Sequence, residues 1–315
     1  MTASINVSYF KYLSNMLSKM AGRVPRDYLY ESVPRSDNWL KRTCPGLYYY
    51  LSLRPVHRLR RHLHASHFLI SYPKCGRTWL RLLLGKALAD HFCIETDDLL
   101  SLKHVARSRE DIPRIRVVHE DNPDYKSPTE LDAAKREFAD KKVIFLVRDP
   151  RDVVVSIYYQ QKYREDYPWE VPDLSDFLRK ERGSMATILA YYNTWMDNRS
   201  VPEDFLLVRY EDMQEDTLRE LKRTVRFCGL GDIPEKTLRR AVEFARFDNM
   251  RSMEEDEEMD SGGLSPGDPE NESSYKTRKG KVGGYREDLS AEDIAFLDDM
   301  IEDKLTPELG YSGNT

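Results

Sequence analysis

The sequence predicts an α/β fold in which helices flank a central, mostly parallel sheet. Short apolar runs alternate with longer segments of helical periodicity, which is typical of parallel sheets covered on both faces. The run VIFLV, Val143–Val147, is apolar throughout, as expected of a strand buried on both faces. Since ligands bind such sheets beyond the carboxyl ends of the strands, the residues that follow each strand are candidates for a site.

The composition suits a folded domain with a substantial core. The chain has 315 residues, of which 40% are hydrophobic and 33% charged, and its net charge is -5. The negative charge argues against a general nucleic-acid binder. We expect residues 1–64 to be an N-terminal extension packed on a domain of residues 65–315. The basic run Arg54–His64 in this extension fits a solvated arm or, alternatively, a contact with acidic lipid or a partner.

The cysteines and the hydropathy predict a cytoplasmic protein without a membrane span. No two cysteines form a CxxC pair, which suits a reducing compartment and argues against a disulfide framework or a zinc site. No apolar run reaches the roughly 18 residues that a membrane span requires. The N-terminus also lacks the apolar core of a signal peptide.

The first strand and helix enclose a candidate anion site. The apolar run Phe68–Tyr72 leads through a tight loop into a helix that begins at Arg77. The loop amides and the positive end of the helix dipole then point to one place, which suits an anion. Lys74 adds a positive charge and Thr78 a hydroxyl. The loop is not a Walker A motif, because its lysine precedes Gly76 instead of following a second glycine.

The stretch YPKCGRTW resembles the 5′-phosphosulfate loop of the sulfotransferases that use 3′-phosphoadenosine-5′-phosphosulfate (PAPS). That loop commonly reads YPKSGTTW or YPKSGRTW, so a cysteine replaces the usual serine here. The resemblance implies the sulfotransferase fold, which is P-loop-like, and PAPS as co-substrate. It implies that the loop holds PAPS through Lys74, Cys75, Gly76, Arg77, Thr78 and Trp79. An ordinary strand–turn–helix with an exposed lysine is the alternative for this stretch alone.

The region between the first helix and the central strand contains the candidate base. Residues 91–114 read as polar and irregular, Ile115–Val118 as a short strand, and Glu130–Asp140 as a helix. His119 ends the short strand, where the family places its catalytic histidine, so the resemblance implies that His119 is the general base. A core or capping histidine is the alternative. Val117 stands where animal cytosolic members have a second lysine, whose work is then dispensable or done by Arg116, Arg77 or another group.

The central strand ends at Arg148, and we expect a helix from Pro150 to about Lys162. An arginine at such a strand end can hold a phosphate through two parallel hydrogen bonds. The segment VRDPRDVVVS resembles the 3′-phosphate motif of the family, commonly RNPKDVAVS, which implies that Arg148 and Ser156 bind the 3′-phosphate of PAPS. A structural ion pair between Arg148 and Asp149 is the alternative.

The remaining chain continues the alternation of strands and helices. One further buried strand is expected at Phe205–Val208. Helices are expected at Leu174–Trp195, Asp216–Phe227, Pro234–Phe244 and Ala291–Leu305. Residues 254–275 are rich in Glu, Asp, Gly, Pro and Ser without apolar periodicity, which predicts a flexible acidic loop.

Three later segments also resemble sulfotransferase motifs. RKGKVGGYREDLS resembles the C-terminal signature RKGxxGDWKxxFT, which implies that Arg278, Lys279 and Gly280 hold the 3′-phosphate with Arg148 and Ser156. Cations beside a glycine let charges and backbone amides approach a phosphate. VRYEDM and FARFDNM resemble segments on the adenine side, which implies that Tyr210, Phe247 and Met250 lie there, together with Trp79 of the YPKCGRTW loop. Ordinary core packing is the alternative for these aromatic residues.

These resemblances together imply a PAPS-dependent sulfotransferase that needs no metal. His119 would take the proton from an acceptor hydroxyl or amine, and Lys74 would stabilise the charge on the leaving nucleotide. We expect a small-molecule acceptor. Glu120, Asp121 and the acidic run 254–260 fit a cationic or polar acceptor or, alternatively, are charges exposed to solvent. The alternatives are a catalytically inactive protein that binds 3′-phosphoadenosine-5′-phosphate (PAP) as a scaffold, and a P-loop nucleotide kinase.

Overall fold

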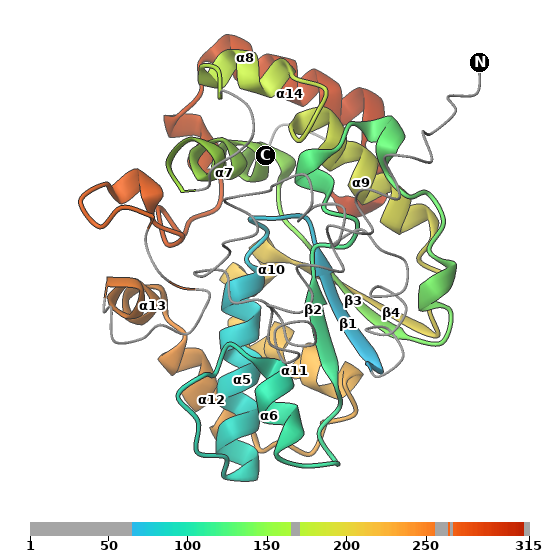
Figure 1. The fold of residues 1–315 in the computed structure, drawn as a ribbon, viewed down its shortest axis with the longest axis vertical. Coiled ribbons are helices and arrows are strands. Elements are labelled where there is room, and N and C mark those ends of the chain that lie inside the picture. Colours follow the sequence, from blue (N-terminus) through green and yellow to red (C-terminus); the bar gives the residue numbers. More distant parts are fainter. Residues whose placement is uncertain (1–64, 165–170, 256–263, 265–266, 312–315) are drawn as a thin grey trace, which may run out of the picture. The chain divides into compact units, whose positions relative to one another are not determined.

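The central element is an all-parallel, four-stranded sheet with the strand order β2-β1-β3-β4 (Figure 1). A computed structural model describes residues 65–164, 171–255, 264 and 267–311. The strands are β1 (His67–Ser71), β2 (Ile115–Val118), β3 (Lys142–Val147) and β4 (Asp204–Arg209). The predicted α/β class, the parallel sheet and each predicted strand are thereby confirmed.

Helices pack in two groups around this sheet, one in the lower and one in the upper part of Figure 1. The lower group comprises α5 (Arg77–Phe92), α6 (Leu102–Arg107), α11 (Thr217–Phe227) and α12 (Glu235–Phe244). The upper group comprises α7 (Pro150–Tyr163), α8 (Leu174–Arg179), α9 (Met185–Asp197) and α14 (Ala291–Lys304). Two further helices are α10 (Tyr210–Glu215) and α13 (Phe247–Glu255). Short 3-10 turns lie at Pro123–Tyr125, Pro128–Glu130, Arg136–Phe138, Glu272–Ser274, Gly284–Glu287 and Pro307–Leu309.

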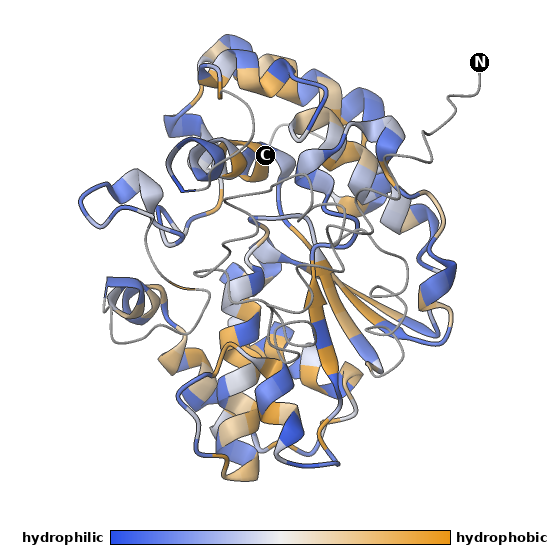
Figure 2. Cartoon of the chain, in the orientation of Figure 1, coloured by the Kyte–Doolittle hydropathy of each residue, from blue (hydrophilic) through white to orange (hydrophobic). Residues whose placement is uncertain are grey.

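The two middle strands, β1 and β3, lie in the core because their side chains are mostly apolar. All five residues of β1 and all but the first of β3 are buried. On one face, the ring of Phe145 in β3 packs on α9, with its centroid 5.7 Å from that of Trp195 and 6.0 Å from that of Tyr192. Figure 2 shows the strands as mostly hydrophobic and the helices as mixed. A strand covered on both faces has no side that favours polar residues.

The register brings the ends of three strands to one edge. Ile70 of β1 pairs with Val118 of β2, and Ser71 of β1 pairs with Leu146 of β3. The predicted site residues that follow β2, β1 and β3 therefore lie along a single edge of the sheet. This placement is the one that the sequence predicted.

The prediction of a helix at Glu130–Asp140 was wrong. The structure forms only the single turns Pro128–Glu130 and Arg136–Phe138, and Leu131 between them is extended, with ψ 140. The side chain of Lys135 is buried, and its ammonium group lies 2.8 Å from the carboxylate of Glu120. This tertiary ion pair and the single-turn capping at Pro128–Glu130 replace the expected helix.

Two other stretches differ from the prediction. The expected helix Leu174–Trp195 is divided into α8 and α9, because Gly183 adopts φ 65 and a Cβ there would lie 2.2 Å from the carbonyl oxygen of Asp124. The stretch expected to be irregular, residues 91–114, contains α6. The side chain of Ser101 caps this helix by accepting a hydrogen bond from the amide of His104.

The predicted acidic loop, residues 254–275, is described only in part. Helix α13 continues to Glu255, and the amide of Asp268 donates a 2.9 Å hydrogen bond to the hydroxyl of Ser274. The predicted extension of residues 1–64 lies outside the described residues. Within the described part of the chain, no helix is long and apolar enough to cross a membrane.

Candidate active site

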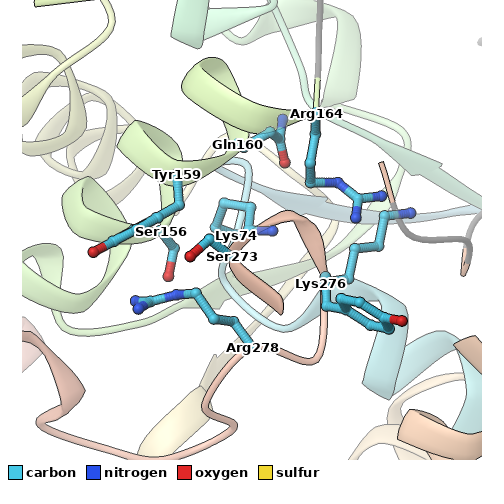
Figure 3. Close-up of a pocket in the computed structure, with 9 residues that line it drawn as sticks. Lys74, Ser156, Tyr159, Gln160, Arg164, Ser273, Lys276 and Arg278 are labelled. Carbon is cyan, nitrogen blue, oxygen red and sulfur yellow. The ribbon is translucent and has the colours of Figure 1, made fainter. Parts of the chain in front are cut away.

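A cleft beside the sheet edge is lined by three segments that are distant in sequence: the loop after β1, helix α7 and the stretch that leads to Arg278 (Figure 3). The lining residues are Lys74, Ser156, Tyr159, Gln160, Arg164, Ser273, Tyr275, Lys276 and Arg278. Four of them are cationic and none is a carboxylate. Figure 3 shows Ser156 and Arg278 on one side of Lys74, and Arg164 and Lys276 on the other. The lining therefore suits an anionic ligand.

The loop after β1 is shaped by two residues with left-handed backbone conformations. Lys74 has φ 72, and Gly76, the N-cap of α5, has φ 90. A Cβ at Gly76 would lie 2.5 Å from the ring of Tyr210, so only glycine fits beneath that ring. The turn leads directly into the 16-residue α5, whose first residues are Arg77 and Thr78. The loop thus ends at a helix N-terminus, the feature that favours anions.

The side chain of Cys75 turns away from the cleft. It is fully buried, and its sulfur lies 3.2 Å from the hydroxyl of Tyr192. Burial raises the pKa of this thiol to about 12. The prediction that Cys75 binds the nucleotide therefore concerns its backbone amide alone.

The guanidinium of Arg148 joins the three predicted motifs. It donates hydrogen bonds to the carbonyl oxygen of Lys74 at 3.5 Å and to that of Lys281 at 3.0 Å, and it lies 3.3 Å from the carboxylate of Asp152. It also lies over the ring of Tyr210, 4.5 Å from the centroid. Arg148 thus adjoins the cleft: it contacts Lys74, which lines it, and the backbone three residues beyond Arg278.

The alternative pairing of Arg148 with Asp149 is not what the structure forms. The carboxylate of Asp149 instead accepts hydrogen bonds from the guanidinium of Arg151, at 2.8 and 2.9 Å, and caps α7 through the Arg151 amide. Asp152 is the partner of Arg148. Its carboxylate also accepts hydrogen bonds from the amides of Gly283 and Tyr285, each at 2.9 Å.

Arg278 and Lys279 share one carboxylate partner. Asp288 lies 3.2 Å from the guanidinium of Arg278 and 2.8 Å from the ammonium of Lys279. Burial alone would raise the pKa of Asp288, but hydrogen bonds from these two cations outweigh burial and lower it. Arg278 lines the cleft, whereas Lys279 also contacts Glu287 and the carbonyl of Gly284 and is not among the lining residues.

Three aromatic residues predicted for the adenine side form a connected group. The rings of Trp79 and Tyr210 meet edge to face with centroids 5.7 Å apart. The ring of Phe247 is 40% exposed and lies so close to Gly280 that a Cβ there would be 2.1 Å from it. Gln214 links the two sides, because its amide donates to the hydroxyl of Tyr210 at 2.8 Å and to the carbonyl of Gly280 at 3.1 Å.

Two of the predicted adenine-side residues are largely covered. Tyr210 and Met250 are both buried, each 6% exposed. The indole of Trp79 donates a 2.9 Å hydrogen bond to the carbonyl oxygen of Ala245. Phe247 therefore offers the most accessible ring of this group.

His119 follows β2 and is oriented by the neighbouring strand. Its Nδ1 atom lies 2.9 Å from the carbonyl oxygen of Ser71, the last residue of β1. A carbonyl can only accept, so Nδ1 is the donor and carries the proton. In the neutral ring, Nε2 is then the nitrogen with the lone pair, which is the state that a general base requires.

The acidic residues after His119 form ion pairs with lysines. Glu120 pairs with the buried Lys135 at 2.8 Å, and Asp121 pairs with Lys126. Carboxylate oxygens of Glu120, Asp132 and Glu137 lie within 4.8 Å of one another. The ammonium of Lys135 also donates a 2.6 Å hydrogen bond to the carbonyl of Asp132, so a positive charge already sits in this cluster.

Several residues that line the cleft were not predicted: Tyr159, Gln160, Arg164, Ser273, Tyr275 and Lys276. Tyr159 and Gln160 lie one helical turn beyond Ser156, so the periodicity of the predicted helix would have placed them on the same face. Tyr275 and Lys276 precede Arg278 at the end of a segment without periodicity, and no sequence signal marked them.

The chain matches known proteins over most of its length. The sequence profile of the family described as Sulfotransferase domain matches residues 65–307. Cytosolic sulfotransferase 12 of Arabidopsis thaliana is 27% identical over 75% of this chain and 76% of its own length. Flavonol 3-sulfotransferase of Flaveria bidentis is 26% identical over 76% of this chain and 81% of its own. Sulfotransferase 2A1 of Homo sapiens is 25% identical over 75% and 83%.

Solved structures share the fold. A mouse sulfotransferase, SULT7A1, complexed with PAP superposes with a TM-score of 0.55 at 20% identity, over 76% of this chain and 84% of that one. Retinol dehydratase in complex with retinol and PAP gives a TM-score of 0.52 at 18% identity, over 76% and 80%.

Proposed function

This chain belongs to the sulfotransferase family and is an enzyme of sulfuryl transfer, and we propose that its donor is PAPS and its acceptor a hydroxyl or amine of a small molecule. The observation that carries the proposal is the convergence of Lys74, Ser156 and Arg278 on one cationic cleft, with Arg148 adjoining it. These residues come from the three motifs that the sequence singled out. The similar solved structures named above hold PAP, which supports the same class of nucleotide here.

The nucleotide is divided between two cationic clusters in this proposal. Lys74, the loop amides and the first turn of α5, including Arg77 and Thr78, hold the 5′-phosphosulfate. Arg148, Ser156, Arg278, Lys279 and Gly280 hold the 3′-phosphate. Trp79, Tyr210, Phe247 and Met250 form the adenine side. The cleft lining fits such a polyanion because it carries four cations and no carboxylate.

Bound PAPS supplies an activated sulfuryl group, and the chain supplies positioning and charge. Transfer is expected in line, through a loose transition state like that of phosphoryl transfer. His119 accepts the acceptor's proton at Nε2 while the new bond to sulfur forms. Lys74 stabilises the negative charge that develops on the bridging oxygen as the old sulfur–oxygen bond breaks. The hydrogen bond from Nδ1 to Ser71 holds the imidazole in the tautomer that this role needs.

The proposed acceptor is a small molecule. Flavonol 3-sulfotransferase is a small-molecule enzyme by its name, which supports a small molecule here. Glu120 and Asp121, which suggested a cationic acceptor, are each paired with a lysine. In the acidic run 254–260, Glu254 and Glu255 are likewise paired with arginines. A cationic or polar acceptor therefore depends on residues 256–260, which lie outside the described residues. We also propose a cytoplasmic location, in line with a relative named as cytosolic.

The experiment is a screen of cell metabolites and a panel of hydroxyl and amine compounds with labelled PAPS. We expect one class of acceptor to gain the sulfuryl label, and matched cationic and anionic acceptors to differ in turnover. PAP binding without any labelled product would support the inactive binding protein instead. Magnesium-dependent ATP hydrolysis would support the kinase.

A further inference from the structure

We propose that Glu254 is a positioning residue that fixes the segment 274–277, so that Arg278 faces the 3′-phosphate of the nucleotide. Glu254 begins the acidic run 254–260 but belongs to none of the nucleotide-binding motifs discussed above, and it does not line the cleft. The inference rests on the proposed function, which assigns Arg278 to that phosphate.

The carboxylate of Glu254 is a fully buried hydrogen-bond acceptor at the end of α13. Its side chain has 0% exposure. Oε1 accepts a 2.6 Å hydrogen bond from the amide of Lys276, and Oε2 accepts bonds from the amide and the hydroxyl of Thr277, at 2.8 and 2.7 Å. The guanidinium of Arg164 lies 3.4 Å from Oε1 and supplies the compensating charge. A buried carboxylate with this many donors holds the groups around it in one arrangement.

Two arginines attach the same segment to neighbouring helices. Arg164, just beyond the end of α7, also donates to the carbonyl oxygen of Ser274. Arg251 of α13 donates to the carbonyl oxygen of Thr277 at 3.2 Å and lies over the ring of Tyr275, 3.7 Å from its centroid. The segment is thus held by residues of α13 and by Arg164, which also pairs with Glu254.

The position of the backbone at Thr277 determines where the side chain of Arg278 lies. Thr277 is its neighbour in the chain, and both polar groups of the Thr277 backbone are held by α13. From there the guanidinium of Arg278 extends over the ring of Tyr159, 4.0 Å from the centroid, on the same side of the cleft as Ser156. A shift of the backbone at Thr277 would therefore move the guanidinium away from Ser156.

The variant Glu254→Gln tests this geometry because it keeps the shape of the side chain. Its amide group would present donors to an array that consists of donors: two backbone amides, a hydroxyl and a guanidinium. At least one of these contacts is then lost, and the segment has to move. The expected consequence is a loss of affinity for the 3′-phosphate in particular.

The experiment compares the dissociation constants of PAP and of adenosine 5′-phosphate (AMP), which lacks the 3′-phosphate, by calorimetry. We expect Glu254→Gln to weaken PAP about 10- to 100-fold and to change AMP by less than about threefold. Arg278→Ala is the reference for loss of the contact itself. Glu220→Gln is the matched control, because Glu220 is also buried and paired with arginines but belongs to α11, away from the cleft.

The outcomes separate this inference from the function on which it rests. If the unmodified protein binds PAP no better than AMP, the proposed function fails. If it prefers PAP and Arg278→Ala removes the preference while Glu254→Gln retains it, only the positioning role is overturned. Should Glu254→Gln not fold, Thr277→Val removes a single hydrogen bond of the array and should lower the preference by a smaller factor. An unchanged preference in Thr277→Val would then overturn the inference.

Discussion

The Oδ1 atom of Asp152, in the first turn of α7, lies 2.9 Å from the backbone nitrogen of Tyr285, which is 133 residues further along the chain. The same carboxylate accepts from the amide of Gly283 and pairs with Arg148. One buried acidic group thus fastens the C-terminal motif to the motif that follows β3. Arg148, which we assign to the 3′-phosphate, is therefore paired with the carboxylate that also binds the C-terminal motif.

The first prediction concerns that carboxylate. Asp152→Ala leaves the amide of Tyr285 without its acceptor and the buried guanidinium of Arg148 without its counter-ion. We expect the free energy of unfolding to fall by about 3 kcal/mol and PAP to bind more weakly. Urea denaturation and calorimetry provide the two measurements. Asp111→Ala, which removes an exposed ion pair with Arg109, should change neither quantity, and equal effects of both variants would contradict the role of Asp152.

The second prediction concerns the base. His119→Ala should lower turnover by roughly 10²–10⁴-fold because proton removal from the acceptor loses its catalyst. The dissociation constant of PAP should stay nearly the same. His104→Ala, on the exposed face of α6, is the control and should leave turnover unchanged. Turnover retained in His119→Ala would remove this residue from the mechanism.

The third prediction uses two glycines that share a left-handed backbone. Gly280 has φ 61 and Gly229 has φ 76, so alanine at either position should destabilise the fold by about 1 kcal/mol. A Cβ at Gly280 would lie 2.1 Å from the ring of Phe247, whereas nothing lies within 4 Å of a Cβ at Gly229. Gly280→Ala should therefore also weaken PAP binding. Unchanged PAP affinity in Gly280→Ala, or an equal loss in Gly229→Ala, would show that the contact with Phe247 does not matter for the nucleotide.

The fourth prediction follows from the lowered pKa of Asp288. Burial opposes the shift, but hydrogen bonds from Lys279 and Arg278 prevail, so the folded state favours the ionised carboxylate. The resulting stabilisation is present above the ordinary aspartate pKa of about 3.9 and is lost as the pH falls through the lowered value. Asp288→Asn should thus reduce stability at about pH 7 and make less difference at about pH 3. Urea denaturation at both pH values measures the free energy of unfolding of each protein. An equal difference between the variant and the unmodified protein at both pH values would contradict this role of Asp288.

Local patterns were sufficient to predict the sheet and the ends of its strands. The apolar run Val143–Val147 and the loop around Lys74 could be interpreted from neighbouring residues alone. The segments where prediction failed depend on distant partners. Lys135 has helix-forming neighbours, yet its ion pair with Glu120 replaces the helix, and the break before α9 reflects the close approach of Gly183 to Asp124.

The candidate site also combines residues that were predicted from the sequence with contacts that were not. The resemblance of their motifs to those of one family implied that Lys74, Ser156 and Arg278 would meet around one nucleotide. It did not predict the acidic partners, Asp152 for Arg148 and Asp288 for Arg278. Both lie close in sequence, at i+4 and i+10, but which of the neighbouring charges pair depends on how the loops fold. These contacts become visible only once the chain is folded.

The most direct test of the account is a calorimetric titration of the full chain with PAP and with AMP, repeated for Arg148→Ala. The account predicts one PAP site per chain, at least about tenfold weaker binding of AMP, and loss of that difference in the variant. Equal affinities for PAP and AMP in the unmodified protein, or no PAP binding at all, would contradict it.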